Sequence, residues 1–384
     1  MLTVIGFSLN KHNCYSRQGR DNCLPTEIKE SLAMHEHFFR SYTSARAHFL
    51  QSCHKQQLGS VESIQHPELG PDGDIFMDVA CFGDERAGKV IVISSGTHGI
   101  EGYSGSGLQS MLLHEGTSSR LPSDTRLMMV HGVNPYGFAW QRRTNELNID
   151  LNRNFIDFNN QPVNTDYREI ADIFEPEVWQ GSGDSIMNTV RAVVKAKGLE
   201  WYQSALSGGQ YEYPDGMFYG GIAPAWSNQM IRRVAKKYLA NASEVVWLDI
   251  HTALGPFGTA ECIVDYAPGS REFTRSVELW GDRVKSMLSG DSYSAPIAGS
   301  MISGLQKAHA EIVGAGLEFG TVSGREVILA LIADQWLHRH GDYRSAQGHA
   351  IKDMMMNAFY PDSDDWRESI AIIARDVVAQ AMNG

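Results

Sequence analysis

Three side chains with metal-binding chemistry follow two apolar segments that lie far apart in the chain. His98 and Glu101 come shortly after the β-branched run Val90–Ile93, and an imidazole and a carboxylate three residues apart can close on one divalent cation. His251 directly follows a second apolar run, residues 244–250. Two histidines and one glutamate leave a fourth zinc position open for water. Each of these residues alone is commonly structural, so the prediction of a metal site depends on the combination.

A second acid, Glu318, lies in the apolar, glycine-containing segment 311–319. A carboxylate in such surroundings is costly to bury without a partner. It is either a paired structural glutamate or a general base with a raised pKa beside the metal. The nearby presence of the other ligands in the predicted fold favours the general base.

These side chains need a scaffold that brings the ends of distant segments together. Apolar runs typical of buried strands cover residues 90–93, 125–133, 244–250 and 311–319, and shorter strand patterns cover 74–82 and 262–266. Helical patterns cover 27–52, 185–204, 227–239, 271–288 and the chain from Gly324 to its end. This alternation predicts an α/β fold, a three-layer α/β/α sandwich around a mixed, mostly parallel sheet. The carboxyl edge of such a sheet is where ligands bind.

Turns and loops separate these elements. Residues 66–73 form a turn-rich connector, and residues 208–221 form an aromatic, glycine-rich loop that is either a packed surface loop or a pocket wall. Residues 1 to about 30 are polar and irregular. We therefore expect an N-terminal polar segment and helix over residues 1–60 and a single catalytic domain over residues 61–384.

Composition limits the partners and the compartment. The 384 residues are 42% hydrophobic and carry a net charge of −12, which argues against nucleic acid or an anionic membrane surface as a partner. No apolar run is long enough for a transmembrane helix, and the first residues lack a basic leader. Five scattered cysteines without C-x-x-C spacing predict free thiols and a cytoplasmic location. The oligomeric state does not follow from the sequence.

A long stretch without periodicity, AWQRRTNELNIDLNRNFIDF, follows the strand predicted over 125–133. It holds Arg142, Arg143 and Arg153 among several asparagines. A solvated surface loop is the simple interpretation. Because the stretch begins at the end of a core strand, we expect it to lie on the same sheet edge as His98.

The motifs together resemble the zinc carboxypeptidases of the funnelin superfamily, which are related to aspartoacylase and succinylglutamate desuccinylase. The resemblance rests on HGIE at 98–101, DLNRNF at 150–155, His251 and Glu318 in this order. It is closest to a bacterial branch of carboxypeptidase-like proteins, whose marks here are SSGTHGIEGYSGSGLQ, NPYGFAWQRRTNELNIDLNRNF, FYGG, GLEFGT and ADQWLHRHG. These marks span roughly residues 35–345, and they imply a zinc exopeptidase-like fold.

The resemblance implies a role for each matching residue. One zinc ion would be held by His98, Glu101 and His251, with Glu318 as the general base for a zinc-bound water. Asn152 and Arg153 would grip the terminal carboxylate of the substrate, for which a planar guanidinium is a suitable partner. One arginine of the Arg142–Arg143 pair would stabilise the oxyanion, and Arg143 is favoured. The tyrosine that usually covers the substrate carboxylate has no clear counterpart, with Tyr293 and Tyr266 as the two candidates.

The sequence thus predicts a zinc-dependent hydrolase that cleaves an amide bond next to a free carboxylate, a metallocarboxypeptidase acting on peptides. The alternatives are an N-acyl amino acid deacylase of the aspartoacylase or desuccinylase type and a non-catalytic relative that binds carboxylates. A serine hydrolase is a further alternative, because GYSGSG at 102–107 resembles a nucleophile elbow. No G-x-S-x-G occurs there, which counts against it.

Overall fold

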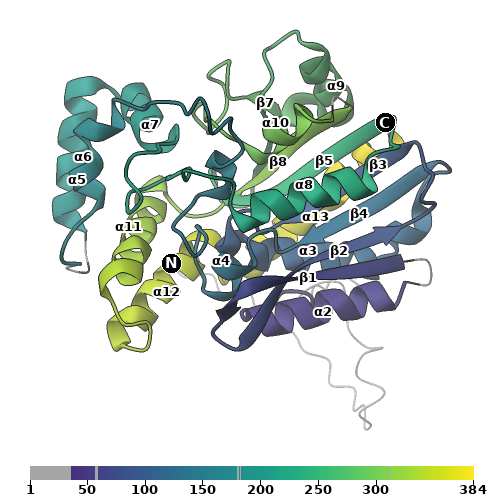
Figure 1. The fold of residues 1–384 in the computed structure, drawn as a ribbon, viewed down its shortest axis with the longest axis horizontal. Helices are drawn as coiled ribbons and strands as arrows, with labels where there is room; N and C mark the ends of the chain where they lie inside the picture. The colour runs from purple at the N-terminus through teal and green to yellow at the C-terminus, as the bar shows by residue number, and fades with distance from the viewer. Residues whose placement is uncertain (1–35, 57–58, 180, 182, 310) are drawn as a thin grey trace, which may run out of the picture.

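A mixed sheet of eight strands runs through the part of the chain that the structure describes (Figure 1). This structure is a computed structural model, and it describes residues 36–384 except 57–58, 180, 182 and 310. The predicted polar segment 1–30, with Cys14 and Cys23, lies outside the described residues. The strands are β1 (Gly59–Gly70), β2 (Gly73–Phe82), β3 (Lys89–Ser95), β4 (Thr125–His131), β5 (Glu244–Ala253), β6 (Ala260–Val264), β7 (Val284–Ser286) and β8 (Ile312–Gly320).

The sheet order is β1-β2-β4-β3-β5-β8-β6-β7. The four central strands β4, β3, β5 and β8 are parallel, whereas β1 and β2 on one side and β6 on the other join antiparallel. The carboxyl ends of the four parallel strands therefore meet at one edge of the sheet. His251 and Glu318 are direct partners in the register of β5 and β8 at that edge.

Helices cover both faces of the sheet, because its central strands are apolar on both sides. Ile91 and Ile93 of β3 face the core shared with α2 (Tyr42–His54), α3 (Gly102–His114) and α13 (Asp364–Asn383). Val90 and Val92 face the other core, shared with α8 (Trp226–Tyr238) and α10 (Met301–Gln306). Figure 1 shows these helices on opposite faces of the sheet. The predicted α/β sandwich with a mixed sheet is confirmed.

The remaining helices surround the carboxyl edge or close the fold. They are α4 (Pro135–Ala139), α5 (Ala171–Phe174), α6 (Asp184–Lys197), α7 (Leu199–Ser207), α9 (Arg271–Trp280), α11 (Gly324–His340) and α12 (Ala346–Phe359). Short 3-10 turns cover Gly99–Glu101, Thr117–Arg120, Leu151–Arg153, Tyr167–Glu169 and Gly281–Arg283. None of the described helices is long and apolar enough to cross a membrane.

Several predicted boundaries are wrong, and glycine or capping residues explain most of them. The helix predicted over 27–52 begins at Tyr42 in the described residues, where the Ser41 side chain caps it by accepting from the Ser44 N–H. The helix predicted over 185–204 is two helices, broken at Gly198 with φ +95°. The helix predicted over 271–288 ends at Trp280, because Gly281 has φ +58° and ψ −135°. The helical pattern predicted from Gly324 to the end of the chain is confirmed, as three successive helices.

The predicted connector 66–73 is also wrong. Residues 66–70 continue β1, with a register irregularity between Gln65 and Leu69. Pro67 suggests a turn in the sequence, but β1 is the edge strand of the sheet. A proline without an N–H is tolerated on an edge strand.

Candidate metal centre

The turn after β3 holds His98 and Glu101 in place by its backbone. The Gly99 and Ile100 N–H groups donate to the carbonyls of Arg143 and Arg142 at 3.1 and 2.7 Å. Gly99 is required by space, because a Cβ there would lie 2.0 Å from the carbonyl carbon of Gly137. The 3-10 turn Gly99–Glu101 is therefore clamped against the loop that carries the two arginines.

Two imidazoles and one carboxylate converge at the carboxyl edge of the sheet. Glu101 Oε1 lies 2.9 Å from His98 Nδ1, and Glu101 Oε2 lies 2.9 Å from His251 Nδ1. The two Nδ1 atoms are 3.2 Å apart, and one ligating atom from each residue lies within 4.8 Å of the others. All three side chains are buried. The structure thus brings the three predicted ligands together.

Both imidazoles are oriented by a further carboxylate on their Nε2 side. His251 Nε2 lies 2.7 Å from Asp249 Oδ2, and His98 Nε2 lies 3.2 Å from Asp150 Oδ1. Metal-binding histidines usually bond a carboxylate or carbonyl in this way, which fixes the ring and leaves the other nitrogen for the metal. The donor set therefore fits a divalent cation such as zinc, with both Nδ1 atoms and the Glu101 carboxylate as its ligands.

The charges around this centre also suit a cation. Burial raises the pKa of Glu101, but the His98 and His251 imidazoles outweigh burial and lower it to about 2. Burial also raises the pKa of Asp150, but the positive charges of Arg143, Arg153 and His98 outweigh burial and hold this pKa well below the usual value. Buried carboxylates of this kind need compensating positive charge.

Glu318 lies beside the three converging residues on the neighbouring strand. Its Oε1 accepts a hydrogen bond from the Leu254 N–H at 2.9 Å, next to Ala253, whose φ is +142°. Burial and the neighbouring Glu101 raise the pKa of Glu318 to about 7. A carboxyl group with such a pKa can both accept and return a proton near neutral pH.

The two adjacent arginines point to different places. Arg143 lies in the centre, where its Nε donates to Asp150 at 3.1 Å and its Nη1 to Glu101 at 3.3 Å. Its Nη2 lies 2.8 Å from His98 Nε2. Arg142 is buried elsewhere and donates to Asp334 at 3.0 Å. The structure therefore does not bring Arg142 into the site.

Asn152 and Arg153 line the same cavity as the metal centre. The Asn152 side-chain oxygen accepts from the Met301 N–H at 2.8 Å. Arg153 donates from Nε and Nη2 to the Ser207 carbonyl and from Nη1 to the Asn152 carbonyl. A guanidinium has five N–H groups, so two remain beyond these three bonds, one on Nη2 and one on Nη1, which also lies 4.0 Å from Asp150 Oδ1.

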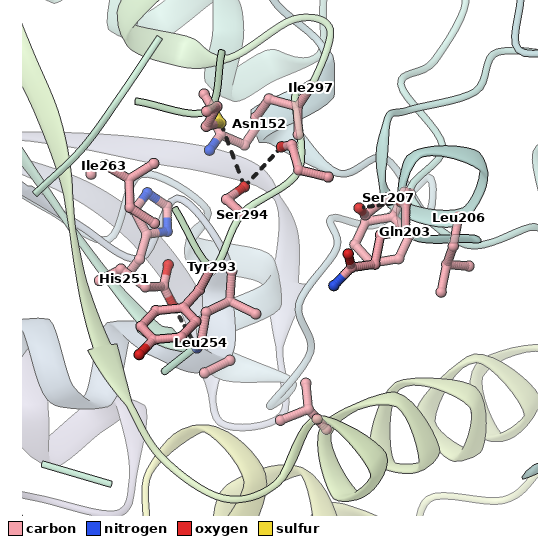
Figure 2. A pocket seen from close by; sticks show the side chains of 18 of the residues that line it. Asn152, Gln203, Leu206, Ser207, His251, Leu254, Ile263, Tyr293, Ser294 and Ile297 are labelled. Carbon is pink, nitrogen blue, oxygen red and sulfur yellow. Dashed lines mark hydrogen bonds between the residues drawn. The ribbon is translucent and has the colours of Figure 1, made fainter. Parts of the chain in front are cut away.

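The cavity has a volume of about 430 Å³, and His251 and Glu318 lie on its wall. Figure 2 shows His251, Tyr293 and Leu254 on one side of it and Gln203, Leu206 and Ser207 of α7 on the other. Tyr293 is 50% exposed and lines the cavity. Tyr266 also lines it, but its hydroxyl accepts from the Gly314 N–H at 3.0 Å. Within the described residues, the Tyr293 hydroxyl forms no comparable hydrogen bond to the backbone, so it is the better of the two tyrosine candidates.

A second group of residues has the types found in serine hydrolases. Ser106 Oγ lies 3.0 Å from His131 Nε2, and His131 Nδ1 lies 3.8 Å from Asp78 Oδ2. The exposed fractions of the three residues are 1%, 0% and 0%, and α2 covers them. Asp78 is bound by Arg46 at 2.7 and 2.9 Å. Substrate has no access to this serine, which counts against the serine hydrolase alternative.

Sequence reasoning missed two residues of the centre. Asp249 lies within the predicted apolar strand 244–250 and Asp150 within the DLNRNF motif, and the sequence pattern assigns neither a role. A buried carboxylate in an apolar strand is a signal of the same kind as Glu318, so Asp249 could have been found by it.

Several solved structures have a fold similar to that of this chain. Bovine thrombin-activatable fibrinolysis inhibitor in complex with tick carboxypeptidase inhibitor has a TM-score of 0.50 and 11% identity, over 91% of this chain and 98% of that chain. Carboxypeptidase A from Helicoverpa armigera has a TM-score of 0.44 and 12% identity, over 83% of this chain and 74% of that chain. Succinylglutamate desuccinylase from Chromobacterium violaceum has a TM-score of 0.36 and 13% identity, over 82% of this chain and 74% of that chain. The first of these likenesses shows that the chain shares this fold, and at the level of the fold it confirms the resemblance drawn from the sequence.

The family follows from its model. The chain belongs to the family described as "Protein of unknown function (DUF2817)", whose model matches residues 38–372. The matched range contains every residue of the metal centre. None of the curated proteins compared with the chain matches it.

Proposed function

We propose that this protein is a zinc-dependent hydrolase that cleaves an amide bond next to a free carboxylate, as a metallocarboxypeptidase. One observation carries the proposal. His98, Glu101 and His251 direct their ligating atoms to one point, and Glu318 stands beside that point on the wall of a cavity. This is a metal site with an adjacent proton acceptor and room for a substrate, which is what metal-assisted hydrolysis requires.

The residues of the chain have separate tasks in this proposal. A zinc ion, when bound, supplies a Lewis acid for the scissile carbonyl and lowers the pKa of water. A Glu318 carboxylate oxygen accepts a proton from the attacking water while the oxygen of that water bonds to the carbonyl carbon of the substrate. The same Glu318 oxygen gives the proton to the amine nitrogen as the C–N bond breaks. Arg143 lies where its N–H groups can stabilise the oxyanion.

The other end of the substrate is held by charge. The two remaining N–H groups of Arg153 and the side-chain amide of Asn152 provide donors for a carboxylate. Because both residues line the cavity of the metal centre, a free carboxylate bound there positions the amide bond next to Glu318. This positioning selects chain ends over internal bonds.

The first experiment separates chemistry from metal binding. Glu318→Gln keeps the shape of the side chain but removes the proton acceptor, so hydrolysis should fall by about 10²- to 10⁴-fold. Elemental analysis should still find one zinc ion per chain in the variant. Near-normal turnover in Glu318→Gln would refute the assignment of the general base.

A second experiment separates the peptidase from the N-acyl amino acid deacylase, which would use the same donors. N-blocked dipeptides and N-acetyl and N-succinyl amino acids are compared at equal concentration with zinc-loaded enzyme. The proposal expects the dipeptides to be cleaved faster. Cleavage confined to the small acyl groups would replace the peptidase with the deacylase.

A further inference from the structure

One aromatic ring of the cavity wall faces two arginines of the candidate site. Phe218 belongs to the aromatic, glycine-rich loop predicted over residues 208–221, and it lines the cavity together with Arg143 and Arg153. The Cζ atoms of the two arginines lie over the Phe218 ring, 5.3 and 5.4 Å from its centroid. Both distances are within the range of about 6 Å over which an aromatic face attracts a cation. The loop therefore forms part of the pocket wall, and both guanidiniums share its ring.

The backbone at Phe218 adopts a conformation that is unusual for a residue with a side chain. Its φ is +53°, in the left-handed region that favours glycine. Such a conformation persists where the surroundings impose it, and functional sites are enriched in it. Here the Met217 N–H donates to the Tyr167 hydroxyl at 2.7 Å, and the Phe218 carbonyl accepts from the Gln210 N–H at 3.3 Å. The loop thus holds Phe218 in a strained conformation in which its ring faces the two arginines.

The same loop is joined to the segment that carries Arg153. The Tyr211 hydroxyl donates to the Arg153 carbonyl at 2.8 Å. Gly220 is required by space, because a Cβ there would lie 2.1 Å from Tyr211 Cε1 and 2.8 Å from the Arg153 carbonyl oxygen. These contacts fix the loop against the backbone of Arg153 without using the Phe218 side chain. The ring can therefore be changed while the attachment of the loop stays in place.

The two guanidiniums need an attraction that leaves their charge available to a substrate. They share the Asp150 carboxylate: Arg143 Nε donates to it at 3.1 Å, and Arg153 Nη1 lies 4.0 Å from it. Burial lowers the pKa of Arg153 and the nearby Arg143 adds to this effect, while Asp150 opposes both. A further carboxylate would offset the repulsion but would compete with an anionic substrate for the N–H groups. An aromatic face attracts both cations and leaves their in-plane N–H groups to other acceptors.

We propose that Phe218 is a positioning residue whose ring orients Arg143 toward the oxyanion and Arg153 toward the terminal carboxylate of the substrate. The inference rests on the proposed hydrolase function, in which the two arginines have these tasks. The ring restricts both guanidiniums before the substrate arrives, so less conformational freedom is lost when the anions bind. Loss of its attraction should weaken substrate binding through Arg153 and slow turnover through Arg143.

The main test weakens the attraction of the ring for cations at nearly constant shape. Nonsense suppression places 4-fluoro-, 3,5-difluoro- or 3,4,5-trifluorophenylalanine at position 218, because each fluorine withdraws electron density from the aromatic face. With zinc-loaded enzyme and N-benzoylglycyl-leucine, kcat should fall and KM should rise stepwise, each by about tenfold at three fluorines. The same series at Phe273, a half-buried ring that does not line the cavity, should change neither constant.

Natural side chains at position 218 give a second measure. Phe218→Tyr keeps an aromatic face and should hold kcat and KM within threefold of wild type. Phe218→Leu keeps an apolar side chain without that face and should match the trifluorinated ring. Thermal unfolding shows which variants are folded. Equal losses in folded Phe218→Tyr and Phe218→Leu, with no trend in the fluorinated series, would assign the ring a purely structural role and overturn the proposal.

A binding measurement keeps this inference separate from turnover. The zinc-loaded Glu318→Gln protein and its forms fluorinated at position 218 are titrated calorimetrically with N-benzoylglycyl-leucine. An affinity that falls stepwise with the number of fluorines supports the role of Phe218 even if the wild type hydrolyses no peptide. Equal affinity across the series, or no binding to the form with an ordinary phenylalanine, overturns it. Hydrolysis by the wild type that is lost in Glu318→Gln would still uphold the hydrolase proposal.

Discussion

Two clusters of this protein contain the side chains of hydrolytic enzymes, and only one of them can act on a substrate. The metal centre has His98, Glu101 and His251 with converging atoms at a cavity. The other cluster has Ser106, His131 and Asp78, fully buried under α2. Its carboxylate is already paired with Arg46, and 3.8 Å separates it from the histidine. The difference shows that residue types and proximity do not suffice, because the reacting side chains must also border a cavity that can hold a substrate.

Removing the metal should cause the largest loss of hydrolysis among the changes that distinguish the two clusters. Dialysis against a chelator should reduce hydrolysis to the background rate, and added zinc should restore it, because the proposed chemistry needs a Lewis acid. Ser106→Ala should keep activity within twofold of wild type. Activity that survives the chelator but is lost in Ser106→Ala, with fluorophosphonate labelling of the wild type, would reverse the roles of the two clusters.

The adjacent arginines give the next largest contrast. Arg143→Ala should lower kcat by about 10²- to 10³-fold, because it removes a donor to the oxyanion. Arg142→Met should keep kcat for the folded protein but lower the free energy of unfolding by about 3 kcal/mol, since it leaves Asp334 with one buried partner fewer. Steady-state kinetics and urea denaturation measure the two effects. Equal losses of kcat in both variants would contradict the separation.

A substitution in the buried serine cluster should change the free energy of unfolding but not the activity. Asp78→Asn breaks the ion pair with Arg46 and should lower the free energy of unfolding by about 3 kcal/mol or more. Zinc content and kcat of the folded fraction should stay unchanged. Loss of zinc in this variant at a temperature where it is fully folded would show that the clusters are coupled.

His131 provides the smallest predicted effect and a dependence on pH. Burial lowers the pKa of His131 to about 4, opposed in part by Asp78. The unfolded chain takes up a proton near pH 6.5, but the folded chain does so only near pH 4. This contribution to stability is therefore complete above pH 6.5 and is lost as the pH falls to 4, by up to about 3 kcal/mol. His131→Phe keeps the stacking on Phe49 and should flatten this part of the pH profile in thermal unfolding; a slope equal to that of wild type would be the contrary result.

The strand ends could be predicted from sequence because they depend on local pattern. Apolar runs followed by polar residues mark β3, β5 and β8, and the register of parallel strands then brings His98, His251 and Glu318 to one edge. Loop geometry does not follow from such patterns. Arg142 and Arg143 are neighbours in the chain, yet Arg142 donates to Asp334 and Arg143 donates to Asp150.

The segment that covers the cavity could not be predicted for a similar reason. Residues 185–204 look like one amphipathic helix, but Gly198 bends the chain and lets α6 and α7 pack side by side. Residues of α6, α7 and α11 line the cavity together, although α11 lies more than a hundred residues further along the chain. No local pattern encodes a contact at that separation.

The cavity wall formed by α6, α7 and α11 limits which substrates the proposed hydrolase could bind. Met187 and Val190 of α6, Leu206 of α7 and Leu331 of α11 line the cavity and are largely buried. A folded polypeptide is too bulky to pass such a barrier, whereas a loose tail or a short oligomer can enter end first. On the proposed function, the cavity would therefore admit short fragments and leave folded proteins in the same compartment uncut.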